Sequence, residues 1–217
     1  MTRLLIKQTA RCAIALLVLA GTGCARLPYT TRVIADDPRV AVMLQHDVDS
    51  AGYSHPLQVS AAGTGAILRG LSLREQVSVP LRWYAEERPP KSVFREDEIA
   101  ILAPHVAEAL AAAEPGQRVY FELRAPGMNL RYDRDVTAGW IAVREAYFHI
   151  TIEYFHSQQP LTRSSPYDYN YPTPRSAPGS YTLYFEPGRF WVLDPKTHRR
   201  AVEFRAFLQS VPEGRPR

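Results

Sequence analysis

The densest group of side chains suited to a metal ion lies in the first quarter of the chain, at His46, Asp47 and Asp49. An imidazole and two carboxylates are donors that many cations accept. Loops that bind hard cations, however, supply more oxygen ligands and turn at a defined glycine. We therefore interpret this group as a solvated turn, and we predict no metal site and no cofactor.

Two carboxylates, Asp133 and Asp135, flank Arg134 in the segment RYDRD. Paired carboxylates perform acid–base chemistry when their environments differ, but the neighbouring arginine favours a solvated strand end. His149 and Glu153 are four residues apart on one face of an expected strand. At a rise of about 3.3 Å per residue they lie about 13 Å apart, which is too far for a direct pair.

No sequence motif assembles a nucleophile, a base and an oxyanion donor. The chain contains no GxSxG, GxGxxG, P-loop or HExxH pattern. His105 follows Pro104 in an expected helix, where a surface position is the default for histidine. We predict a protein that is not an enzyme and has no catalytic residue. The alternative is a hydrolase whose site is assembled in space from Asp133, Asp135 or His149.

The N-terminus has the layout of a secretory signal. Three basic residues, Arg3, Lys7 and Arg11, precede an apolar run at 12–20 that ends in small residues. A helix needs about 20 apolar residues to cross the hydrocarbon core of a bilayer, and this run is roughly half as long. The segment therefore predicts a signal peptide at 1–23 rather than a permanent membrane span.

Residues 20–24, AGTGC, resemble the lipobox of bacterial lipoproteins, in which small residues precede a cysteine. The resemblance covers residues 1–25 only, and Gly21 stands where that class usually has leucine. It implies that Cys24 carries fatty acid such as palmitate and becomes the first residue of the mature chain. Ala25 in the next position implies the outer membrane of a Gram-negative cell, on its periplasmic side. The alternative is an ordinary signal that releases a soluble periplasmic protein.

Cysteine usage agrees with acylation. The chain has two cysteines. Cys12 would leave with the signal, so Cys24 would have no partner for an internal disulfide. Each buried CH₂ of an acyl chain contributes about 0.8 kcal/mol of membrane affinity, so several chains anchor a protein firmly. We therefore expect two kinds of partner: the membrane through this N-terminal lipid, and a protein of the cell envelope.

The charge of the mature chain gives no reason to expect a nucleic-acid partner. The full sequence has 26 basic and 22 acidic residues, and three of the basic ones lie in residues 1–23. The mature count is therefore 23 minus 22, or +1. A charge this small creates no strong field for phosphate groups.

The 194 residues that remain after the signal (217 minus 23) are enough for one hydrophobic core. We predict a lipidated tether at 24–38, a single domain at 39–212 and a frayed tail at 213–217. Alternation of apolar and polar residues predicts strands at 76–84, 119–123, 137–144, 146–156 and 181–185. Segments 39–45 and 201–208 fit either a strand or a helix.

The strand at 146–156 is expected to place Phe148, Ile150, Ile152 and Tyr154 on one face. The segment EPGR at 186–189 fits a type II turn, which has proline and glycine in its two central positions.

Two helices are expected. Ser60 can cap a short helix that runs through Arg69 with Gly70 just past its end, although a strand competes there because two glycines lower helix propensity. Apolar residues recur at helical spacing after Glu96, and Pro104 predicts a kink or a restart. Few helices among many strands indicate an α+β fold, with a mainly antiparallel sheet and one or two helices packed on one face.

A segment rich in proline and tyrosine, 158–180, interrupts the strands. We interpret it as a long loop, because prolines break strand pairing and little aliphatic surface is available to bury. Tyr167, Tyr169 and Tyr171 are candidate partner contacts, since tyrosine offers a large contact area at small entropic cost. The leading hypothesis is therefore a lipid-anchored binding or scaffolding protein of the cell envelope. A periplasmic carrier of a small apolar or glycan ligand is the alternative.

Overall fold

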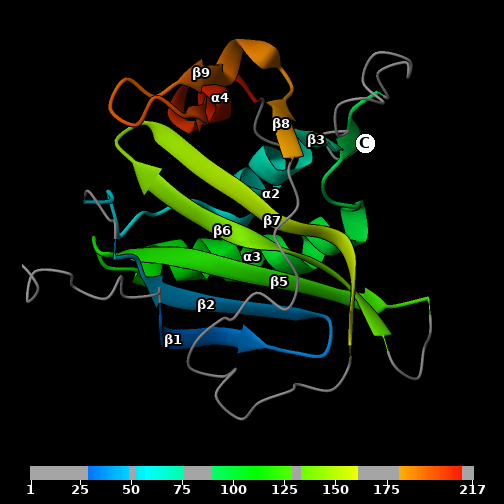
Figure 1. Ribbon diagram of the computed structural model, residues 1–217. Helices are drawn as coiled ribbons and strands as arrows, with labels where there is room; N and C mark the ends of the chain where they lie inside the picture. Colours follow the sequence, from blue (N-terminus) through cyan, green and yellow to red (C-terminus); the bar gives the residue numbers. More distant parts are fainter. Residues whose placement is uncertain (1–28, 49–51, 76–88, 129–132, 161–180, 212–217) are drawn as a thin grey trace, which may run out of the picture.

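The computed structural model of the protein describes residues 29–48, 52–75, 89–128, 133–160 and 181–211. These residues form an α+β fold in which antiparallel strands make two sheets and helices cover one face of the larger sheet (Figure 1). This arrangement confirms the predicted fold class.

The larger sheet has seven strands in the order β1-β2-β5-β6-β7-β10-β9, and the smaller sheet has the order β4-β3-β8. The strands are β1 (Tyr29–Asp36), β2 (Val40–His46), β3 (Leu71–Glu75), β4 (Lys91–Ser92), β5 (Gln117–Pro126), β6 (Asp133–Arg144), β7 (Tyr147–Pro160), β8 (Tyr181–Phe185), β9 (Trp191–Leu193) and β10 (Arg200–Glu203). The helices are α2 (Ala61–Arg69), α3 (Glu96–Ala112), α4 (Phe204–Ser210) and the 3₁₀ helix η3 (Gly188–Phe190).

Helix α3 supplies much of the core. It packs on β1, β2 and β5, and α2 packs against it. Its side chains at Ile99, Leu102, Val106 and Leu110 are all buried, as their three- and four-residue spacing predicts. Burial of one such side chain contributes about 1.5–3 kcal/mol, so this stripe is a main reason why the helix lies on the sheet.

The predicted restart at Pro104 does not occur, because α3 runs without interruption from Glu96 to Ala112. Proline removes the N–H that would bond to the carbonyl four residues earlier, at Ala100. Both Pro104 and Ala100 are exposed. Water can therefore solvate that carbonyl while the buried side of the helix keeps its contacts.

The segment at 60–70, for which the sequence left a helix and a strand open, forms helix α2. The hydroxyl of Ser60 accepts a hydrogen bond from the N–H of Gly63 at 3.0 Å, which is the expected N-cap. Gly70 is the C-cap residue, as predicted. Ile67 and Leu68 are fully buried, so packing outweighs the helix propensity lost at the glycines.

A bulge in β7 changes which residues share a face. Ile152 pairs with Gly139, yet Ala138 pairs with Tyr154, so Glu153 is an extra residue on this strand. Ile150 and Ile152 belong to the main core, whereas Tyr154 belongs to a second apolar cluster with Tyr120, Val136 and Ala138. The prediction that Tyr154 shares a face with Ile152 is therefore wrong.

Gly139 makes this bulge possible. A β-carbon at that position would lie 2.0 Å from the carbonyl oxygen of Thr151 on β7. Only glycine allows the two backbones to approach this closely.

Part of the predicted tether at 24–38 is a strand, because β1 (Tyr29–Asp36) pairs with β2 in the sheet. Most of its side chains are exposed, so its sequence shows no alternation of apolar and polar residues that would predict a strand. Backbone pairing with β2 keeps it in the sheet. Segment 39–45 is a strand, as part of β2. Segment 201–208 contains both expected structures, since the end of β10 leads directly into α4.

The predicted type II turn at 186–189 is wrong. That turn needs a positive φ at Gly188, but the only described glycine with positive φ is Gly52, and Gly188 begins η3 instead. The predicted strand at 76–84 and the segment 161–180 of the predicted loop lie outside the described residues, and β7 extends to Pro160.

Candidate functional site

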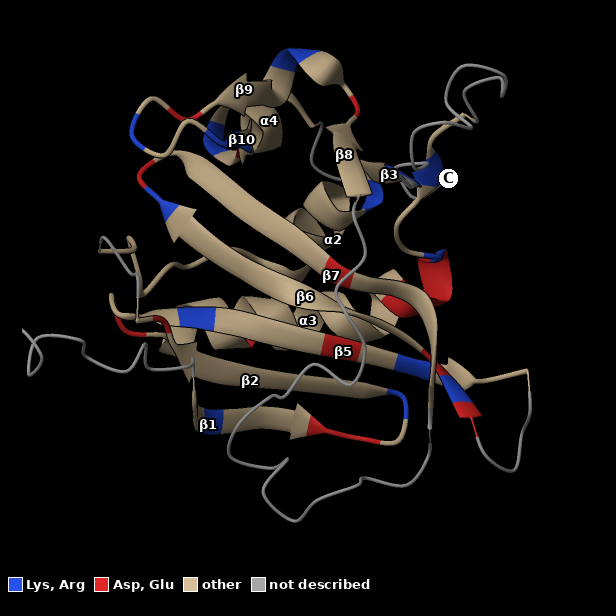
Figure 2. Ribbon diagram, in the orientation of Figure 1, with Lys and Arg blue, Asp and Glu red and all other residues tan. Residues whose placement is uncertain are grey.

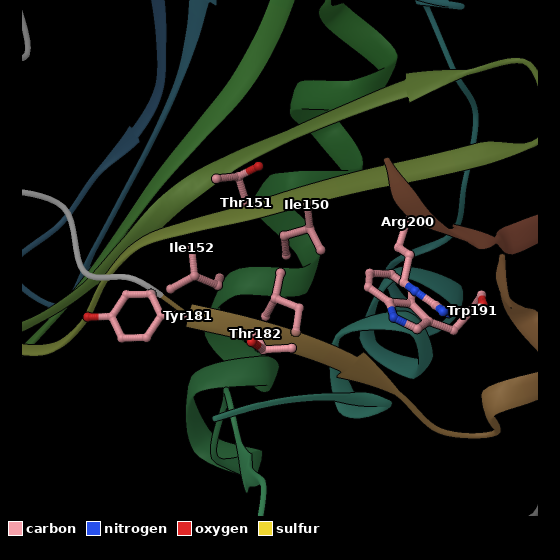
Figure 3. A pocket seen from close by; sticks show the side chains of 8 residues that line it. Ile150, Thr151, Ile152, Tyr181, Thr182, Trp191 and Arg200 are labelled. Atoms are coloured by element: carbon pink, nitrogen blue, oxygen red, sulfur yellow. Dashed lines mark hydrogen bonds between the residues drawn. The ribbon is translucent and has the colours of Figure 1, made fainter. Parts of the chain in front are cut away.

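A pocket of about 330 Å³ lies between β7 and β8. Its lining comes from three parts of the chain: Ile150, Thr151 and Ile152; Tyr181, Thr182 and Leu183; and Trp191 with Arg200 (Figure 3). Figure 3 shows Ile150 and Ile152 pointing from β7 toward β8, while Thr151 points to the other side of the sheet. The pocket thus has an apolar floor between two strands.

The pocket exists because β10 is short. Only Tyr147 and Phe148 of β7 pair with β10, through Glu203 and Val202. From there β7 runs on to Pro160, while β10 turns away to pair with β9. On this side of β7, beyond Phe148, no strand is paired within the described ranges.

Strand β8 forms the opposite wall. It pairs with β3 on one side, and within the described part of the chain no strand pairs on its other side. Its residues Tyr181 and Leu183 pack partly on the main core. The ring of Tyr181 meets Phe155 of β7 edge-on at 6.2 Å, so this contact bridges the two walls.

Aromatic and basic side chains form one end of the pocket. Trp191 stacks on Phe185 with ring centroids 6.5 Å apart, and Phe185 meets Phe207 edge-on at 5.0 Å. Arg200 is exposed and donates a hydrogen bond from Nη1 to the carbonyl of Trp191 at 3.3 Å. The pocket is therefore apolar along its length and positively charged at this end.

Charge is sparse along the pocket wall. Figure 2 shows charged residues mainly near strand ends and in connections, with the middle of β6 and most of β7 uncharged. Glu153 is the only charged residue of β7. Burial raises the pKa of Glu153, and Arg118 acts in the opposite direction.

A buried polar cluster of His149, Asp194 and Arg144 lies near the start of β7. Nε2 of His149 is 3.0 Å from Oδ2 of Asp194, and Nη1 of Arg144 is 3.7 Å from the same oxygen. The His149 contact is close, but it lies outside hydrogen-bond geometry. Asp194 also accepts hydrogen bonds from the N–H of Lys196 at 2.8 Å and from the hydroxyl of Thr197 at 2.8 Å.

The charges in this cluster follow from its surroundings. Burial acts to raise the pKa of Asp194, but the hydrogen bonds from Lys196 and Thr197, together with the electrostatic interactions with His149 and Arg144, lower that pKa overall. Burial lowers the pKa of His149, Arg144 adds to this, and Asp194 opposes it. The cluster therefore holds a carboxylate beside an arginine and a neutral imidazole, which is a structural arrangement for a buried charge.

A second polar group lies next to it. The guanidinium of Arg144 lies 5.5 Å from the ring centre of Tyr53, whose hydroxyl donates to Asp47. Burial, followed by the Asp47 carboxylate, raises the pKa of Tyr53. His55 meets Tyr53 edge-on at 5.7 Å, and its Nε2 accepts the N–H of Val143 at 3.3 Å.

The residues considered for metal binding are not gathered into a site. Asp47 is occupied by Tyr53, and His46 packs against the ring of Tyr29 at 5.3 Å. Asp49 lies outside the described residues. Within the described ranges no three His, Cys, Asp or Glu side chains come together as a metal site.

The residues considered for hydrolysis are also separated. Asp135 contacts Nδ1 of His156 at 2.9 Å, while His149 pairs across the sheet with Ala142. Seven residues separate Asp135 from Ala142 on β6, or about 23 Å at the usual rise. His105 is half-buried on α3 and takes no part in either group.

Four residues predicted to act in targeting or contact, Cys24, Tyr167, Tyr169 and Tyr171, lie outside the described residues. Three residues that the sequence interpretation missed are Asp194, Trp191 and Arg200. Asp194 begins the segment DPKT, and its bond to Lys196 N–H is the kind of local turn that aspartate favours, so a turn signal was present. Trp191 and Arg200 belong to short strands whose partners only the fold reveals.

Comparison with protein-family models, with curated proteins and with solved structures found no match. Among the described helices, none has the length and apolar character needed to cross a membrane.

Proposed function

We propose that the protein is a lipid-anchored component of the bacterial cell envelope that acts by binding, and that the pocket between β7 and β8 is its binding site. The observation that carries this proposal is the pocket itself, which has an apolar floor and volume of about 330 Å³. Binding sites are concave and mostly apolar, with few polar groups that orient the ligand, and this volume is at the lower end of their usual range.

The anchor belongs to the same proposal. The segment AGTGC supports acylation of Cys24, which would hold the domain at the periplasmic side of the outer membrane. Tyr167, Tyr169 and Tyr171 remain the partner contacts that we propose, because tyrosine offers a large contact area at small entropic cost.

The anchor is tested by labelling cells with radioactive or clickable palmitate and then fractionating the membranes. The wild-type protein is expected in the outer-membrane fraction with label, and Cys24→Ser is expected to lose both. Cys12→Ser is the matched control, because Cys12 would leave with the signal. A mature chain that begins elsewhere than at Cys24, or that carries no fatty acid, contradicts the anchor.

A second candidate function is a carrier of a small apolar ligand. The observation in its favour is the same apolar pocket, whose Ile150, Ile152, Leu183 and Trp191 resemble the lining of a small-molecule site more than that of a polar one. Native mass spectrometry of the gently purified protein tests it. A bound molecule of defined mass that Trp191→Ala releases supports the carrier, and an unloaded protein from every preparation counts against it.

A further inference from the structure

The edge of β7 turns peptide groups into the pocket. The carbonyl of Ala146 accepts a hydrogen bond from the N–H of Phe204 at 3.2 Å, on the β10 side. Hydrogen-bonding groups alternate from side to side along a strand, so those of Phe148, Ile150 and Ile152 turn the same way. Phe148 uses its groups with β10. Those of Ile150 and Ile152 face the pocket, where no described strand lies beside them.

The edge of β8 is oriented in the complementary way. The N–H of Glu186 donates to the carbonyl of Gly70 at 2.8 Å, on the β3 side. By the same alternation, the peptide groups of Tyr184 turn to β3 and those of Leu183 turn away from it, toward the pocket. The two walls therefore present hydrogen-bonding edges to the same space.

The side chains on these walls suit an apolar strand. Ile150 and Ile152 are 5% exposed and form the floor, and Leu183 packs on the same core. A strand paired with these edges would place every second side chain on the same face as Ile150 and Ile152, next to them. Arg200, at one end, has no carboxylate partner among the described residues. A negative group at that end of the incoming strand would meet it.

We propose that the pocket binds an extended segment of a protein partner, which pairs with β7 and β8 together and joins the two sheets into one. The segment carries apolar residues at alternate positions and a carboxylate beside Arg200. Addition of a strand to an exposed sheet edge is an established mode of peptide recognition, with affinity from the backbone and specificity from alternate side chains. This inference rests on the binding function proposed above and names the class of partner.

The test uses the purified full-length chain in detergent micelles and a phage-displayed library of random decapeptides. The tightest peptide recovered is synthesised, and amide hydrogen exchange is measured with and without it. Exchange at Ile150, Ile152 and Leu183 is expected to slow at least tenfold. Exchange at Thr151 is expected to change little, because its groups turn to β6. This neighbour is the internal control.

One peptide variant and two protein variants sharpen the result. N-methylation of alternate amides in the peptide is expected to abolish binding, since it removes every donor that faces one of the two edges. Arg200→Glu is expected to weaken binding about fivefold when the peptide ends in a carboxylate. Arg205→Glu makes the same charge change on an exposed residue of α4 that does not line the pocket, and it is expected to have no effect.

Several results would overturn the strand proposal. These are a library that yields no peptide, full binding of the N-methylated peptide, or protection that appears away from Ile150 and Leu183. Protection of these amides in the protein alone, in a monomer or in a dimer, would also overturn it, because the edges would already be occupied.

Failure of the peptide proposal can be distinguished from failure of the binding function proposed above. One result would overturn the peptide proposal and leave the binding-site proposal intact. In that result a small apolar molecule fills the pocket and blocks peptide binding, while the amide of Ile150 continues to exchange. Loss of palmitate from the wild-type chain would remove the anchor without changing peptide binding in micelles.

Discussion

His55 makes the stability of the protein dependent on pH. Its side chain is 5% exposed, and its Nε2 accepts the N–H of Val143, which requires an unprotonated nitrogen at that position. Burial lowers the pKa of His55 from 6.5 to about 4. The folded protein therefore keeps this imidazole neutral at pH values where the unfolded chain has already bound a proton.

The sign and size of the effect follow from this difference in pKa. Between pH 6.5 and about 4 the unfolded chain binds more protons at His55 than the folded one, so acid favours unfolding. The contribution is complete above pH 6.5 and is lost as the pH falls through this window. At about 1.4 kcal/mol per pH unit, the loss from pH 7 to pH 4 is about 3 kcal/mol.

The assay is urea unfolding of the wild type and of His55→Gln at pH 7 and at pH 4. Glutamine supplies an acceptor for Val143 but does not titrate, so its stability lacks this pH term. The difference in unfolding free energy between the two proteins is expected to shift by about 3 kcal/mol in favour of the variant at pH 4. A difference that stays the same at both pH values would refute the reasoning.

Three further predictions concern stability, each measured as the change in urea midpoint at constant slope. Gly139→Ala is expected to cost about 3 kcal/mol, since its β-carbon would lie 2.0 Å from the carbonyl oxygen of Thr151, whereas Gly188→Ala meets nothing within 4 Å and serves as the control. Equal stability of these two variants would contradict the close approach. Ser60→Ala is expected to cost about 1 kcal/mol by removing the cap of α2; Ser60→Asp should restore it, and an unchanged midpoint in the alanine variant would argue against the cap. Asp194→Ala is expected to cost about 3–5 kcal/mol, because it leaves a buried arginine without its counter-charge; a loss below about 1 kcal/mol would show that water already solvates that guanidinium.

Much of the local structure could be predicted from the sequence, because its causes lie within a few residues. The serine at 60 and the glycine at 70 mark the ends of α2, and the apolar spacing after Glu96 predicts the buried stripe of α3. Alternation in 119–123 and 137–144 identifies two central strands of the sheet. The same patterns indicate an α+β fold.

Prediction was wrong where a distant partner decided the outcome. The strand β1 has few buried side chains and is held by pairing with β2, so its sequence looks like a tether. The helix restart expected at Pro104 did not occur, because the tertiary packing of α3 leaves the proline on the solvent side. The bulge at Glu153 depends on Gly139 from another strand and reverses the faces of the residues that follow.

The sequence by itself determined the periodic elements and the fold class, and it predicts a signal peptide at the N-terminus, since each of these patterns lies within neighbouring residues. Three features depended on the tertiary structure alone. Strand β10 pairs with only two residues of β7, and β8 forms the opposite wall of the resulting pocket. Asp194 contacts His149. These features join residues that lie 33 to 56 positions apart in the sequence, from Ile150 with Leu183 to Tyr147 with Glu203. Side-chain patterns report whether a residue is buried, and they carry no information about which edge of a strand remains unpaired, because backbone hydrogen-bonding groups are the same in every residue except proline.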